Sequence, residues 1–194
     1  LNHYAYKRVA LRGNLQKQMF KGAVSVKDSN LIASMIGEIN LRNEKPHYQL
    51  DGRVTKADLL NLNFIQSPLK LNADFKLDLQ FNDLDDLEGG IVLTDLTVKQ
   101  PNIADLSVDL LSFNSDISRK NRKRYKLNSD LVSVDVEGDF LPNRLRSDLL
   151  QLWGEYGNYF KKNDGERALF YNQKKSEISD KYNADFTIIC HHLS

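Results

Sequence analysis

The chain has 194 residues, of which 41% are hydrophobic and 27% charged, a balance that excludes wholesale disorder. Its 27 basic and 26 acidic side chains nearly cancel, so no net field draws it toward nucleic acid or an anionic membrane. The single cysteine, Cys190, excludes an internal disulfide and a thiolate metal cluster. The sequence contains neither a signal peptide nor an apolar run of about 18 residues, so we expect any targeting or anchoring element to lie outside it.

Apolar and polar residues alternate along most of the chain, which is the period of a β-strand with one buried and one solvated face. The clearest case is residues 69–81, where seven apolar side chains alternate with six polar ones. At about 3.3 Å per residue, this strand would span roughly 40 Å. The same alternation predicts shorter strands over residues 20–26, 31–41, 48–55, 104–110, 132–140 and 184–190.

Turn-forming residues separate these runs at positions 13–14, 28–30, 43–46 and 100–102. Successive strands joined by short turns favour an antiparallel meander. We therefore expect an all-β, mainly antiparallel fold of eight or nine strands.

One segment changes period. After Pro142 the apolar residues recur at the three- and four-residue spacing of an amphipathic helix, which we expect over residues 143–161. Trp153 on this helix is expected to be a packing anchor, with the gating of a groove as the alternative. We divide the chain into a β-groove segment (1–142), the helix (143–162), and a charged linker with the start of a further strand (163–194).

The apolar face of strand 69–81 needs a cover. Each of its large side chains contributes about 1.5–3 kcal/mol when it leaves water. A second sheet, closure into a barrel, or lipid or a partner chain on a curved open sheet would each provide that cover. The mostly aliphatic lining favours an elongated groove over a closed sandwich.

Residues 48–63 carry a resemblance to a known family. There a strand is followed by Ala57-Asp58-Leu59 and then by Leu60-Asn61-Leu62, an order typical of TamB-like proteins of the AsmA superfamily, particularly the Bacteroidetes type. Flanking segments resemble that family in the same order, and the match covers roughly residues 10–160. These segments are residues 22–26, 28–30, 37–40, 87–93, 127–130 and 137–140, with a helix carrying residues 149–156.

The resemblance implies a taco-like β-groove with an apolar interior. It also implies a periplasmic protein, anchored to the inner membrane through a segment not present here, that moves phospholipid toward the outer membrane or assists outer-membrane protein assembly. Its partners would be phospholipid acyl chains and, through regions outside this chain, an outer-membrane barrel protein of the assembly machinery. The alternative is a closed β-sandwich, a binding or structural module of an envelope protein without a lipid conduit.

On the groove hypothesis, acyl chains contact the apolar side chains of the alternating strands. We expect no catalytic residue, enzymatic activity, cofactor, metal site or nucleic-acid partner. The groove-lining candidates are Tyr48, Leu50, Val54, Leu69, Leu71, Phe75, Leu77, Leu79, Phe81, Val132, Val134, Val136 and Phe140.

Three charged or polar clusters have simpler explanations than a reactive site. The carboxylates of residues 83–88 are expected to form a solvated turn, because Leu87 stands where a calcium loop needs a ligand. The basic run 119–124 is expected to be a hairpin loop, with a head-group or partner contact as the alternative. Residues 190–192 alternate across a strand, which makes a shared metal ion unfavourable.

Overall fold

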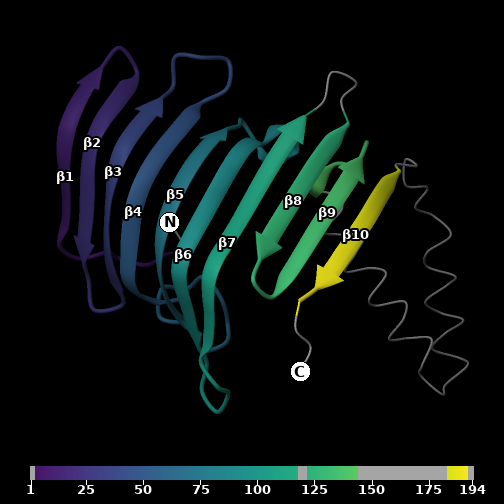
Figure 1. Ribbon diagram of the computed structural model, residues 1–194. Coiled ribbons are helices and arrows are strands. Elements are labelled where there is room, and N and C mark those ends of the chain that lie inside the picture. The colour runs from purple at the N-terminus through teal and green to yellow at the C-terminus, as the bar shows by residue number, and fades with distance from the viewer. Residues whose placement is uncertain (1–2, 118–121, 144–182, 192–194) are drawn as a thin grey trace, which may run out of the picture.

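The computed structural model describes residues 3–117, 122–143 and 183–191. In this part of the chain ten strands form one antiparallel sheet, in which every strand pairs with its neighbours in sequence. Figure 1 shows them side by side, from purple β1 at one edge to yellow β10 at the other. The strands are β1 (Val9–Gln16), β2 (Met19–Lys27), β3 (Leu31–Asn40), β4 (His47–Asp58), β5 (Lys70–Gln80), β6 (Glu88–Lys99), β7 (Leu106–Ile117), β8 (Lys123–Ser129), β9 (Val132–Gly138) and β10 (Ala184–Cys190).

The predicted all-β, antiparallel meander is therefore confirmed, as an open sheet. At about 4.8 Å between neighbouring strands, the ten strands make it roughly 43 Å wide. The longest predicted strand, 69–81, appears as β5 with one residue fewer at each end. The predicted strand 184–190 pairs with β9, so it belongs to the same sheet.

One predicted turn is wrong. Gly13 lies inside β1, opposite Gly22 of β2, and the chain reverses at Lys17 and Gln18 instead. Both of these residues have positive φ, 47° and 63°, which is the backbone of the two-residue turn that matches the twist of a hairpin. Gly13 is needed within the strand, because a Cβ there would lie 2.7 Å from the ring of Phe20.

The sequence patterns did not identify β1, β6 and β8. In β6 the alternation is broken by a bulge: the pairing with β5 shifts by one residue, and Asp95 has a φ of 52°. In β8 the last residues of the basic run, Lys123 and Arg124, are strand residues rather than loop residues. The predicted hairpin loop is thus shorter than residues 119–124, and residues 118–121 lie outside the described chain.

Of the predicted helix 143–161, Asn143 is described and is helical, as is Pro142 before it, and the rest lies outside the described residues. Trp153 and most of the predicted linker also lie outside them. Within the described ranges, one further helical element is present, the 3₁₀ turn Leu84–Asp86. No helix there is long and apolar enough to cross a bilayer.

The apolar face of the sheet as the candidate functional site

Cross-strand pairing joins the apolar side chains into continuous rows. Leu77 of β5 stands opposite Leu50 of β4 and Ile91 of β6, and residues directly opposite in an antiparallel pair share a face. Followed through every pairing, this central row crosses all ten strands. Its members are Gly13, Gly22, Gly37, Leu50, Leu77, Ile91, Phe113, Leu127, Val134 and Ile188.

A second row lies two residues along each strand. Leu79 stands opposite Tyr48, and Tyr125 stands opposite Val136. This row also reaches both edges of the sheet. It comprises Leu15, Phe20, Ile39, Tyr48, Leu79, Gly89, Ser115, Tyr125, Val136 and Phe186.

On the other side of the central row, Phe75 lies opposite Gly52 and Leu93. The Phe75 ring covers the glycine, since a Cβ at Gly52 would lie 2.6 Å from it. Phe20 covers the paired Gly13 and Gly22 in the same way. At these three glycines an aromatic ring therefore fills the place of the missing side chain, and the surface stays apolar there.

Most predicted groove residues lie on this face. The central row contains Leu50, Leu77 and Val134, and the second row contains Tyr48, Leu79 and Val136. Four further candidates point to the same face of their strands without belonging to either row: Val54, Leu71, Phe75 and Val132. Leu69 and Phe81 flank β5 rather than belonging to it. Phe81 stacks on Tyr48, with ring centroids 5.0 Å apart.

The prediction for Phe140 needs correction. It follows β9, is 1% exposed, and packs edge-on against Tyr125 with ring centroids 5.4 Å apart. A side chain so enclosed cannot line an open surface. Leu79 and Val136, each 8% exposed, are also buried near this end of the sheet.

The sequence reasoning missed the contribution of β6, β7 and β8 to the face. Ile91, Leu93, Phe113 and Leu127 all stand in the rows. The usable signal was the alternation of Tyr125 and Leu127 with basic residues, which the run of positive charge obscured.

Both ends of the face are covered by connections between strands. At one end Leu62, in the connection from β4 to β5, is 1% exposed. The strand residues Ala57, Ala73 and Val108 are buried as well. A single layer of strands cannot bury side chains of its own face this deeply, so this connection and the end of the sheet bury one another.

The N-terminal segment is fastened at the β2–β3 turn. The Tyr4 hydroxyl and the backbone N–H of Lys7 donate hydrogen bonds to the carboxylate of Asp28, a buried residue. The bond from Tyr4, with the backbone N–H groups of Asn30 and Lys7, lowers the pKa of Asp28 to about 2. The carboxylate therefore stays charged at neutral pH and holds the segment in place.

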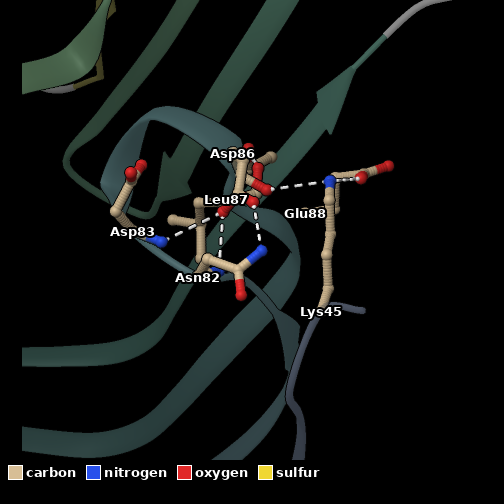
Figure 2. A network of polar contacts seen from close by, with 7 residues as sticks. Lys45, Asn82, Asp83, Asp86, Leu87 and Glu88 are labelled. Atoms are coloured by element: carbon tan, nitrogen blue, oxygen red, sulfur yellow. Dashed lines mark hydrogen bonds and ion pairs between the residues drawn. The ribbon is translucent and has the colours of Figure 1, made fainter. Parts of the chain in front are cut away.

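The acidic turn between β5 and β6 lies at the opposite end, where the backbone carbonyls of Leu87 and Leu84 accept hydrogen bonds from the hydroxyls of Ser115 and Tyr125. Figure 2 shows the polar contacts within this turn. Asp86 accepts hydrogen bonds from the backbone N–H groups of Asn82 and Asp83, at 2.7 and 3.1 Å. Burial raises the pKa of Asp86. Together, these two bonds and the one from the Asn82 side-chain amide lower the pKa by more than burial raises it, so the net shift is downward. Lys45 pairs with Glu88 at 2.5 Å and also donates to the Asp86 carbonyl. These carboxylates build a turn, as predicted.

The opposite face of the sheet is mostly polar and carries cross-strand ion pairs. Ile36, Val92 and Leu110 are exposed among them. Arg53 binds the carboxylate of Asp74 through two guanidinium nitrogens, which lowers the pKa of Asp74. Lys76 lies 3.3 Å from Asp51 on the next row. Exposed ion pairs of this kind contribute little to stability, up to about 1 kcal/mol each, but their charged groups keep this face solvated.

Two hollows lie on the polar face. The larger, about 700 Å³, crosses β1 to β6 between Arg12, Ser34, Arg53 and Lys76. The smaller, about 530 Å³, lies beside it near Gln49. Both hollows lie on the polar face and not on the apolar face. The taco-like apolar groove therefore remains a prediction.

The described residues contain no group of three or more His, Cys, Asp or Glu side chains that could hold a metal ion. Comparison of the chain with protein-family models, with curated proteins and with solved structures finds no match. The site is therefore defined by its geometry, an apolar face about ten strands wide with covered ends and an exposed middle.

Proposed function

We propose that this chain is a lipid-binding sheet segment of an envelope protein, whose apolar face carries phospholipid acyl chains between two membranes. Assistance to outer-membrane protein assembly would use the same face. The observation that carries the proposal is the set of apolar rows crossing all ten strands, with all described strands in one sheet. The resemblance of residues 48–63 to TamB-like proteins points in the same direction.

Water is a poor partner for such a face. A fully buried aliphatic side chain gains about 1.5–3 kcal/mol over an exposed one. The middle of the face includes Leu50, Leu77 and Ile91, which are half-buried. At the β10 edge the same row ends at Ile188, which is 63% exposed. Contiguous apolar patches of this kind usually mark sites for lipid or for a protein partner.

Acyl chains suit this surface better than a shaped ligand would. Half of the residues in the two rows are aliphatic, and nearly all the others are aromatic or glycine, so along the rows a ligand would be held by contact area and not by directed bonds. A lipid could then slide along a row without breaking a directed bond, which is what a conduit requires. The polar face with its ion pairs would remain toward water.

The proposal predicts co-purifying lipid. Native mass spectrometry of the protein purified from cells without detergent is expected to show adducts in the mass range of phospholipids, and extraction should release them. A lipid-free monomer that unfolds cooperatively and binds little hydrophobic dye would contradict the proposal. It would favour the alternative, a closed module whose apolar face is covered by protein.

A further inference from the structure

Lys123 is an isolated cation on the apolar face. It begins β8, where it alternates with Arg124 and shares a face with Tyr125 and Leu127. Its cross-strand neighbours on that face are Ile117 and Gly138. Lys123 is nevertheless only 8% exposed, as buried as the apolar Val136 nearby.

In the described part of the chain, the side-chain ammonium of Lys123 has neither a hydrogen bond nor an ion pair, although its backbone pairs with β7 and β9. The residues on either side of it are paired. Arg122 lies 3.7 Å from both Glu137 and Asp185, and Arg124 lies 2.6 Å from Asp135. Lysine is almost never buried without a partner, because an unpaired ammonium outside water is costly. Among the described residues of the basic run, 122–124, Lys123 is thus the one cation to which the described part of the chain supplies no anion.

We propose that Lys123 binds the phosphate of an amphiphile whose acyl chain lies on the apolar rows. This inference rests on the proposed function and adds the chemistry of the head group. Tyr125 is two residues along the strand, about 7 Å away, and it belongs to the row that includes Val136 and Phe186. The spacing places a charge beside an apolar row, as a phosphate lies beside the hydrocarbon chain that it carries.

The chemistry of the site favours phosphate. A lysine ammonium is a compact charge with three donors and a common ligand of phosphate oxygens. Tyr125 does not compete for the ligand, since its hydroxyl donates to the Leu84 carbonyl at 3.2 Å.

A matched pair of lipids tests the inference. We would titrate the protein with 1-palmitoylglycerol 3-phosphate and with 1-palmitoylglycerol, which share one acyl chain and differ in the phosphate. The protein should bind the phosphate form at least about tenfold more tightly, the effect of one charge-assisted hydrogen bond. Lys123→Met keeps the aliphatic stem and should bring the ratio near one, and Lys123→Arg should retain the preference.

The control is Lys126→Met, on the polar face of the same strand, where Lys126 pairs with Asp135 at 3.9 Å; it should leave the ratio unchanged. A preference that survives in Lys123→Met would overturn the inference and leave the proposed function standing. Failure of both lipids to bind the unaltered protein would overturn both. Inorganic phosphate should not displace the lipid; displacement at millimolar concentration would show a free-anion site instead of a head-group site.

Discussion

Leu77→Asp is expected to weaken lipid binding at least about tenfold, whereas Val92→Asp is expected to leave it within about twofold of the unaltered protein. Leu77 stands in the central row between Leu50 and Ile91. A carboxylate there would have to be desolvated beneath an acyl chain without a partner. Even a neutral polar group costs about 1–3 kcal/mol when it is buried in this way, by mutational data, and an ionised carboxylate costs more. That range corresponds to roughly a 5- to 150-fold loss of affinity.

Val92 provides the matched control. It lies on the adjacent strand, and its side chain is on the polar face, opposite Lys76 and Ser112. An aspartate there would face the Lys76 ammonium, so the substitution has a comparable cost in strand propensity without entering the apolar rows. The bound fraction of a phospholipid would be measured by native mass spectrometry, with circular dichroism confirming the sheet. Equal losses in the two variants would show that lipid does not distinguish the faces.

Phe140→Ala is expected to lower the free energy of unfolding by about 3–5 kcal/mol, the usual cost of deleting a buried phenylalanine. The Phe140 ring is 1% exposed and packs against Tyr125. Tyr125 in turn packs against Phe113, with 5.6 Å between the centroids of these two rings. Edge-to-face pairs add about 0.5–1.5 kcal/mol beyond burial. A whole domain is stable by only about 5–15 kcal/mol, so a large part would be lost.

The next residue serves as its control. Leu141 is 40% exposed, and Leu141→Ala should change the free energy of unfolding by no more than about 0.5 kcal/mol. Urea unfolding followed by circular dichroism would compare the two midpoints. Similar midpoints would mean that Phe140 does not close this end of the face.

The fold was largely predictable because alternation is a local signal. In β5, every second residue from Leu71 to Leu79 is apolar, and neither a bulge nor a glycine interrupts the run. Elsewhere in the sheet, neighbouring strands are joined by short turns that the sequence showed, as at residues 28–30 between β2 and β3 and at residues 100–102 between β6 and β7. An antiparallel meander is therefore among the topologies that sequence patterns determine best.

What the sequence did not reveal depends on contacts between distant residues. Gly13 resembled a turn because the ring of Phe20 that needs the space comes from the next strand. The bulge at Asp95 adds one residue to β6, so the apolar residues on its two sides no longer follow a strict two-residue spacing. A search for alternation alone therefore does not recognise this segment as a strand. Phe140 continued the alternation of β9, yet it leaves the strand and packs against Tyr125.

Lys123 illustrates the same difficulty for the site. In sequence it is one member of a basic run, and its neighbours Arg122 and Arg124 are ordinary surface partners of acidic residues. Only the register of β8 shows that it shares a face with Tyr125 and Leu127. Charge patterning identified the run as a possible head-group contact, but it could not select the residue.

The central claim, that the apolar face contacts lipid, is tested most directly by photo-cross-linking in cells. A benzophenone amino acid would replace Leu77 in one variant and Val92 in another, on adjacent strands and opposite faces. Irradiation is expected to attach phospholipid to the variant labelled at Leu77 and not to the variant labelled at Val92. Absence of lipid at Leu77, or equal labelling at both positions, would contradict the account.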